Sequence, residues 1–125
     1  MSLFANIDLM NKALDATLLR KNVISDNISN VDTPNYKRKD VSFESILQKE
    51  LNAAEDYNIR NIDLDKVEAQ VYVDQSNSAY RMDGNNVDID VEMVEEAKVY
   101  ARYNALITRV NAQLNRFTTV LQNIK

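Results

Sequence analysis

Acidic and amide side chains gather at Asp83–Asp90, where their oxygens are of the kind that binds calcium. Calcium-binding loops place oxygen ligands at alternate positions and a glycine at the sixth position. Here the fifth position is Val87, and the glycine, Gly84, is second. The stretch therefore does not fit a calcium loop. It predicts instead a turn that leads into a helix capped by Asp88 or Asp90.

Three further carboxylates, Glu92, Glu95 and Glu96, invite comparison with a catalytic acid–base set. The chain has no histidine and no cysteine, which excludes Ser–His–Asp and Cys–His catalysis and the common zinc sites. Its single glycine leaves no glycine-rich phosphate loop. We interpret the three glutamates as ordinary acids at the start of a helix. We expect no enzyme activity, no cofactor, no metal and no small-molecule substrate.

Two short motifs suggest surface chemistry, but neither is specific. Asn27-Ile28-Ser29 matches a glycosylation sequon, yet it falls inside a helical pattern, and we treat the match as chance. Lys37-Arg38-Lys39 is a basic cluster too short to indicate a nucleic-acid site, and the net charge of −4 also argues against one. We predict a solvated loop for these three residues.

The composition indicates which elements must position these residues. The chain has 125 residues, of which 45% are hydrophobic, with one glycine and one proline. All-β folds need many turns, and turns use those two residue types, so long helices are favoured. No run approaches the ~18 apolar residues of a membrane-spanning helix. The first twenty residues also lack the continuous apolar core of a cleaved signal peptide.

The N-terminal pattern predicts one long helix over residues 3–31. Its apolar residues recur at alternating steps of four and three, which is the spacing of a heptad seam. A second apolar column, at Leu9, Ala16 and Val23, predicts that this helix is wedged between two neighbours. We expect the following residues of the two columns at a subunit interface: Leu3, Ile7, Met10, Leu14, Val23, Ile24, Ile28 and Val31.

The C-terminal pattern, over residues 88–124, is the strongest in the sequence and also predicts a long helix. Two apolar columns repeat every seven residues without an intervening glycine or proline, and Glu96 interrupts the second column. Val99, Leu106 and Val120 widen the apolar face. We expect both columns at a subunit interface: Met93, Tyr100, Ile107, Leu114 and Leu121 in the first, and Tyr103, Val110, Phe117 and Ile124 in the second.

Charge is polarised along the same segment. Residues 83–96 carry acids and no bases, and residues 97–125 carry bases and no acids, an order that suits the helix dipole. Arg102, Arg109 and Arg116 form one polar column. This column is either a solvated face or a docking stripe for an acidic surface of a neighbour.

The middle segment connects the helices with shorter patterns. Pro34 disfavours helix at the preceding residue and ends the first helix. Ser42 is positioned to cap a short helix, and Val67–Val73 alternates apolar and polar residues like a strand. A lone strand is not stable, so we expect the middle segment to be mobile or to pair with another element.

Together the patterns predict a mostly α protein whose two long terminal helices form an antiparallel coiled coil. We divide its one structural domain into an N-terminal helix at residues 1–34, a loop-rich middle at 35–87 and a C-terminal helix at 88–125. The apolar columns exceed what one antiparallel pair can bury. The surplus points to contacts with other chains.

One stretch near the N-terminus resembles the bacterial flagellar rod and hook axial proteins. It runs through Asn27–Tyr36 and is preceded by Ala13–Asp15 and Arg20. That family typically has an Asn-Ile-Ala-Asn core followed by Thr-Pro-Gly-Tyr. Here Ser29 and Asn35 replace the usual alanine and glycine. Asparagine tolerates the left-handed backbone, so the turn can be kept.

A second stretch, Asp83–Met93 followed by Tyr103–Leu106, together with the short length, resembles the proximal-rod members of that family. The resemblance implies a structural subunit that self-assembles by coiled-coil packing and transmits torque. It implies a periplasmic place in the flagellar basal body and export without a cleaved signal peptide. It also marks a turn motif used in interactions, formed by Asn30, Thr33, Pro34 and Tyr36.

The partners implied by the resemblance are proteins, with no nucleic acid among them. They are other copies of this chain, other rod proteins, the membrane-ring and rod–ring junction proteins, and the flagellar type III export apparatus. A soluble helical export chaperone or adaptor of a secretion system is the alternative, because amphipathic helices of this kind would also hold a client chain.

Overall fold

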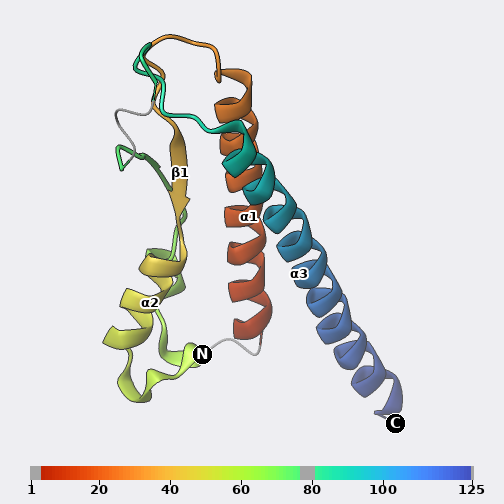
Figure 1. Cartoon of the computed structure of the whole chain (residues 1–125). Helices are drawn as coiled ribbons and strands as arrows, with labels where there is room; N and C mark the ends of the chain where they lie inside the picture. Colours follow the sequence, from red (N-terminus) through yellow and green to blue (C-terminus); the bar gives the residue numbers. More distant parts are fainter. Residues whose placement is uncertain (1–3, 77–80, 125) are drawn as a thin grey trace.

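The computed structural model of the chain describes residues 4–76 and 81–124. Helix α1 (Ala5–Ser29) and helix α3 (Ile89–Asn123) pack side by side in opposite directions (Figure 1). The mostly α fold with two long antiparallel terminal helices, predicted from the sequence, is confirmed. None of the described helices is long and apolar enough to cross a membrane.

The segment between the two helices folds into an arm. In chain order, its described part holds strand β1 (Lys39–Ser42), helix α2 (Glu44–Ala53), the 3-10 turns η1 (Glu55–Tyr57), η2 (Ile59–Asn61) and η3 (Leu64–Lys66), and strand β2 (Gln70–Val73). Strands β1 and β2 pair antiparallel, with Lys39 opposite Val73 and Ser42 opposite Gln70. The predicted strand therefore exists as β2. Its partner is β1, a segment of the same chain for which the sequence pattern did not predict a strand.

Two predictions for this segment were wrong. Lys39 lies in β1 and not in a solvated loop, and Ser42 ends β1 where the sequence suggested a helix cap. The N-cap of α2 is Phe43, whose side chain makes no capping bond. Phe43 is buried in the core of the arm, so burial of this ring, rather than a capping hydroxyl, accompanies the start of α2.

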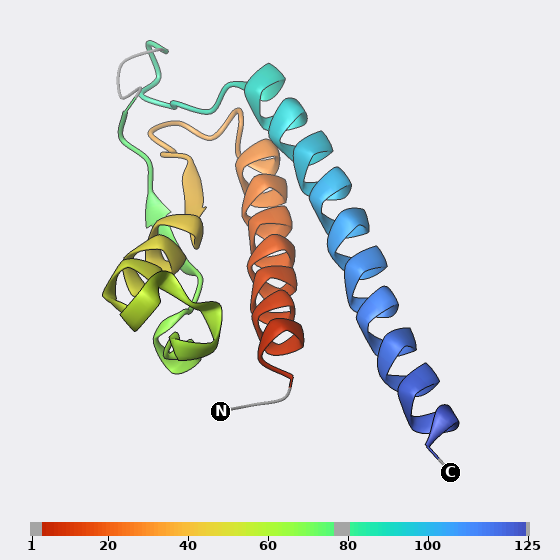
Figure 2. The same ribbon diagram turned by 90° about the horizontal axis from the view of Figure 1, so that it is seen from below.

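Helix α1 lies between α3 on one side and the arm on the other in both views (Figures 1 and 2). The core between α1 and the arm is formed by Ala16, Phe43, Ile62 and Val67. Val23, seven residues after Ala16 in the same column, is also buried. The prediction of a helix with two covered sides therefore holds, but the second covering element is the chain's own arm and not another chain.

Helix α3 is the longer of the pair and begins with a side-chain cap. The Asp88 carboxylate accepts hydrogen bonds from the backbone amides of Asp90 and Val91, which confirms the predicted cap. With 35 residues against 25 for α1, α3 extends about 15 Å further at 1.5 Å per residue. The rings of Phe4 and Phe117 meet at 5.0 Å, and α3 continues beyond this contact.

A buried α1 side chain tests the three-layer arrangement. We expect Val23→Asp to lower the free energy of unfolding by about 3 kcal/mol or more, because a carboxylate would be placed where Val23 is only 5% exposed. Val120→Asp, at a 59% exposed site of α3, is the matched control and should change it by about 0.5 kcal/mol or less. Thermal melts followed by circular dichroism measure both. Equal melting curves for the two variants would contradict the buried position of Val23.

Candidate functional site

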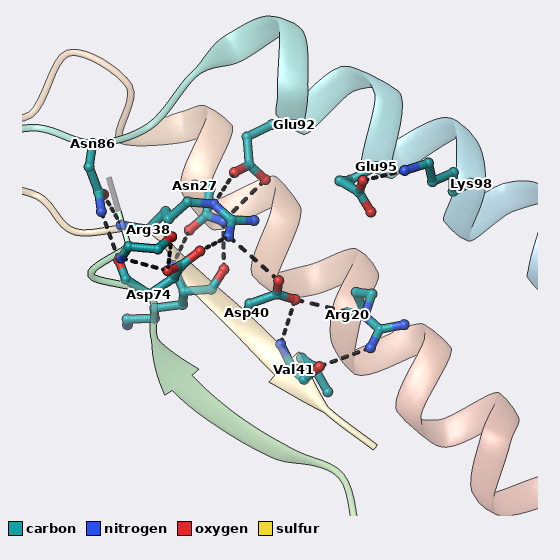
Figure 3. Close-up of polar contacts among 12 residues, drawn as sticks. Arg20, Asn27, Arg38, Asp40, Val41, Asp74, Asn86, Glu92, Glu95 and Lys98 are labelled. Atoms are coloured by element: carbon teal, nitrogen blue, oxygen red, sulfur yellow. Dashed lines mark hydrogen bonds and ion pairs between the residues drawn. The ribbon is translucent and has the colours of Figure 1, made fainter. Parts of the chain in front are cut away.

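A cluster of polar side chains joins all three layers near the start of α3 (Figure 3). We name it the polar clasp and define it as Asn27, Arg38, Asp74, Asn86 and Glu92. Asn27 lies near the end of α1, Arg38 and Asp74 flank the two strands, and Glu92 lies in the first turn of α3. Asn86 precedes α3, accepts from the Arg38 amide at 2.6 Å and donates to the Asp74 carbonyl at 2.7 Å. Their contacts fix how the arm and the two helices meet.

Asn27 on α1 is fully buried. Its side-chain amide bonds with the edge of β1 in the way that the backbone of a neighbouring strand would. Its side-chain oxygen accepts from the Lys39 amide at 2.9 Å, and its nitrogen donates to the Lys39 carbonyl at 2.8 Å. The same amide also donates to Glu92 at 3.2 Å and accepts from the Tyr36 hydroxyl at 3.1 Å. Because this amide is fully engaged and shielded from solvent, the sequon that includes Asn27 is not accessible.

Arg38 and Glu92 form a buried ion pair. Arg38 Nε donates to Glu92 Oε1 at 2.7 Å and a terminal nitrogen donates to Asp74 at 2.5 Å, while the Glu92 side chain is 0% exposed. Burial alone would lower the pKa of Arg38, but its hydrogen bonds to Glu92 and Asp74 outweigh burial and raise that pKa. Hydrogen bonds from Ser76, reinforced by Arg38, hold the pKa of Asp74 below its usual range.

The sequence interpretation was wrong for Arg38, whose side chain is 12% exposed and not solvated. Glu92 is an acid in the first turn of a helix, as interpreted, but its burial and its pairing with Arg38 were missed. A signal for Glu92 was nevertheless present, because it lies seven residues before Val99 and fourteen before Leu106, in line with the apolar seam. A carboxylate at a seam position needs a buried partner. No local pattern identifies Arg38 as that partner.

The turn between α1 and β1 is held by the segment that precedes α3. The Asn85 side chain lies within 2.8–3.0 Å of the carbonyls of Asn30, Val31 and Thr33 and acts as a donor to this turn. Gly84 has a φ of 77°, and a β-carbon there would meet Asn35 Oδ1 at 2.5 Å. Both the backbone conformation and the close approach therefore require glycine at this position.

Two residues of the predicted turn motif, Asn30 and Tyr36, bond with other residues of the same chain. Asn30 caps the end of α1, donates to the Asp26 carbonyl and accepts from the Thr33 hydroxyl. The Tyr36 hydroxyl donates to Asn27, and burial raises the pKa of Tyr36. Thr33 and Pro34 are exposed, so they are the members of the motif that remain open to another molecule.

A second ionic cluster ties the arm to both helices. Arg20 on α1 donates to both carboxylate oxygens of Glu44 at 2.8 and 2.9 Å, and Arg102 on α3 donates to the same carboxylate at 2.8 Å. The hydrogen bonds from Arg20 lower the pKa of Glu44 to about 2. The first arginine of the predicted polar column is thus engaged within the chain, whereas Arg109 and Arg116 line a surface groove beside Met10.

The two predicted interface columns of α3 have different surroundings. Every residue of α3 that follows the four–three spacing from its first turn to the Phe4 contact is buried or half-buried and forms the seam with α1: Glu92, Glu96, Val99, Tyr103, Leu106, Val110, Gln113 and Phe117. The second predicted column therefore lies largely in this seam. Its last residue, Ile124, is 68% exposed because it lies beyond Phe117.

The first predicted column of α3 lies beside the seam and is mostly open to solvent. Ile107 is half-buried. The other members are exposed by 46% to 70%, and they are Met93, Tyr100, Leu114 and Leu121. Lys21 of α1 lies 5.4 Å from the Tyr100 ring centre, in a cation–π contact at the edge of this face. We call these four exposed side chains the open column.

The N-terminal interface residues also divide into two groups. Ile7, Val23 and Ile24 are buried inside the chain. Met10, Leu14, Ile28 and Val31 are half-buried. Leu3 lies outside the described residues. The accessible part of this predicted set is therefore limited to the half-buried side chains along α1.

Comparison with known proteins places the chain in a class. The family profile described as flagella basal body rod protein matches residues 11–37, which cover most of α1 and the turn after it. Together with the full-length similarities that follow, this shows that the chain belongs to the flagellar basal body rod proteins.

The full-length similarities are to flagellar basal body rod protein FlgB of several bacteria. The protein from Bacillus subtilis is 39% identical over 127 residues, covering 97% of each chain. The protein from Borreliella burgdorferi is 36% identical over 120 residues, covering 86% of this chain and 87% of its own. The protein from Escherichia coli is 27% identical over 130 residues. These relatives are named as rod proteins and not as chaperones, so they favour the rod over the alternative of an export chaperone.

The buried ion pair generates a stability prediction. We expect Arg38→Met to lower the free energy of unfolding by about 3–5 kcal/mol, because Glu92 would stay buried without its cationic partner. Arg109→Met, on the exposed side of α3, should change it by about 0.5 kcal/mol or less. Urea unfolding measures both. Adding Glu92→Leu to Arg38→Met should restore part of the loss, and an additive further loss would contradict the pairing.

The Glu44 carboxylate generates a pH prediction. Its pKa in the folded chain, about 2, is below the unfolded value, so the ion pair stabilises the fold above about pH 5 and this contribution is lost as the pH falls towards 2. Glu44→Gln should therefore lower the melting temperature near neutral pH and match the parent near pH 2. The loss should be about 1 kcal/mol or less, since the Glu44 side chain is 57% exposed.

The control for this pH series is Glu55→Gln, at an exposed glutamate whose carboxylate makes no ion pair with another described residue. It should leave the melting temperature unchanged across the series. A difference between Glu44→Gln and the parent that persists at pH 2 would show that the pair acts through packing and not through charge.

Proposed function

We propose that this chain is a structural subunit of the proximal flagellar rod, which assembles through the open column of α3 and transmits torque between its neighbours. The observation that carries the proposal is the position of this column. It repeats every seven residues beside the packed seam, and its side chains are 46% to 70% exposed in the single chain. The family to which the chain belongs supports the rod as the place of assembly.

The physical basis of assembly is burial of apolar surface. An exposed Leu or Met side chain contributes about 1.5–3 kcal/mol when it is fully buried. The open column offers three such side chains and the ring of Tyr100, and Val120 and Ile124 add two further apolar side chains near the end of α3. Seven-residue spacing lets them pack into a helix of a neighbouring subunit in the manner of a coiled coil.

Torque transmission requires that a subunit resist deformation between its contacts. The polar clasp and the Arg20–Glu44–Arg102 cluster tie the arm to both helices at two levels along α1. A twist applied to α3 is then shared by α1 and the arm through the directional contacts of both clusters as well as through the apolar seam. We propose that this cross-linking gives the subunit its stiffness.

The remaining partners follow from the rod role. We propose contacts with further copies of this chain, with other rod proteins, and with membrane-ring and rod–ring junction proteins at the base. We also propose a periplasmic location in the basal body, reached through the flagellar type III export apparatus without cleavage of a signal peptide. The resemblance of Asn27–Tyr36 and Asp83–Met93 to proximal-rod proteins supports these assignments.

A substitution in the open column tests the proposal. Leu114→Asp should abolish motility and incorporation into the rod, because a carboxylate would have to be desolvated at the contact. Since Leu114 is 46% exposed in the single chain, the isolated variant should keep its helical signal. Arg109→Ala, five residues earlier in the polar column, should have a smaller effect. Motility and co-purification with rod proteins report the outcome, and normal assembly of Leu114→Asp would exclude the open column as the interface.

A further inference from the structure

The two-stranded ribbon of the arm has one closed edge and one open edge. The antiparallel hydrogen-bond pattern alternates along each strand, and the Asp74 amide donates to the Arg38 carbonyl at 2.9 Å. In the register of this ribbon, Asp40 therefore bonds with Tyr72 and Ser42 with Gln70. The backbone groups of Lys39 and Val41 point away from β2, and those of Val71 and Val73 point away from β1.

Side chains close the edge of β1 completely. The amide and the carbonyl of Lys39 both bond with the Asn27 side chain. The Val41 carbonyl accepts from Arg20 at 2.8 Å, and the Val41 amide donates to Asp40 at 2.7 Å. All four outward backbone groups of β1 are therefore satisfied, and no further strand can add there.

The edge of β2 has no such cover. No described residue donates to or accepts from the outward amides and carbonyls of Val71 and Val73. The side chains of Val71, Tyr72 and Val73 are 46% to 49% exposed. Figure 2 shows β2 on the side of β1 that faces away from α1. An open strand edge that carries apolar side chains is a template for pairing with another strand.

We propose that the open edge of β2 pairs antiparallel with β2 of a second copy of this chain, with Tyr72 opposite Tyr72 of the second copy. The spacing of the outward groups supports this choice of partner. In a two-fold arrangement centred on Tyr72, Val71 faces Val73 of the second copy and Val73 faces Val71. The two pairs form four backbone hydrogen bonds, and the two ribbons join into one four-stranded sheet.

The side chains of this arrangement are compatible with one another. Tyr72 lies directly across from its equivalent, and aromatic pairs across strands are favourable. Asp74 lies opposite Gln70 of the second copy and Glu68 lies opposite Ser76, so no like charges face each other. The chain as a whole is acidic, with a net charge of −4, so a register that avoids opposed carboxylates is the one that a second copy can adopt.

The pairing surface is separate from the open column of α3. The arm and α3 lie on opposite sides of α1 (Figures 1 and 2). Two chains joined through β2 therefore keep both open columns exposed. The inference goes beyond the rod role and does not depend on it, because it follows from the strand edge alone.

Disulfide trapping tests the register directly, since the chain contains no cysteine. Facing residues of a non-hydrogen-bonded antiparallel pair lie about 4.5 Å apart at Cα, within the range of a disulfide. Tyr72→Cys should therefore form a covalent dimer rapidly under mild oxidation. Gln70→Cys, two residues away on the same exposed strand, is the matched control and should form little, because its equivalent lies far from it. Equal trapping at both positions, or none at residue 72, would overturn the proposal.

Sedimentation over a concentration series tests the backbone contact. The parent mass should rise from 14.3 kDa towards twice that value. Val71→Pro removes an outward amide without touching the β1–β2 ladder and should abolish the rise. Val71→Lys, which protects an edge by charge, should do the same if the proline variant fails to fold. Leu114→Asp should dimerise like the parent. A parent that stays monomeric, or a dimer lost in Leu114→Asp but kept in Val71→Pro, would overturn the proposal.

Discussion

The buried pair of Arg38 and Glu92 is the interaction on which the rest of the structure depends. Glu92 is fully excluded from solvent, and an uncompensated carboxylate in that position would cost several kcal/mol. Arg38 must therefore reach it, which fixes the residue that precedes β1 against the first turn of α3. Asp74 accepts from the same guanidinium and fixes the end of β2. Asn27 joins the end of α1 to Glu92 and to Lys39 of β1. The strands, the turn and the helix pair are thus positioned from one point.

Some surfaces around this ion pair are covered by other parts of the chain, and others are exposed. The side of α1 that faces the arm is covered by the core around Phe43 and Val67, and the side that faces α3 is covered by the seam. The outer edge of β1 is closed by Asn27 and Arg20. What remains open is the column of α3 beside the seam and the edge of β2. Both present exposed apolar side chains in a regular spacing, and β2 also presents backbone groups unpaired with any described residue. These are the surfaces through which a single chain would bind a neighbour.

The sequence predicted the parts that depend on local periodicity. The seven-residue repeats indicated both long helices, and Asp88 indicated where α3 begins, because capping and amphipathicity are encoded within a few residues. The arm was predicted poorly because its order comes from contacts distant in sequence. Lys39–Ser42 has no strand signal of its own and becomes a strand by pairing with Gln70–Val73 and with Asn27. Arg38 was misassigned for the same reason, since its partner lies 54 residues away.

The polar clasp also explains why the helix pair has one register. A heptad seam by itself permits neighbouring registers that differ by seven residues, because similar apolar side chains meet in each. Sliding α3 by one heptad would place Val99 near Asn27 and carry Glu92 away from Arg38. The Asn27 amide and the Arg38 guanidinium would both lose their bond to Glu92, and the Glu92 carboxylate would lose both of its partners. Such a loss is larger than any gain from apolar contacts of equal area. The clasp therefore sets the position of α3 along α1, and with it the height at which the open column and the last apolar residues of α3 meet a neighbouring subunit.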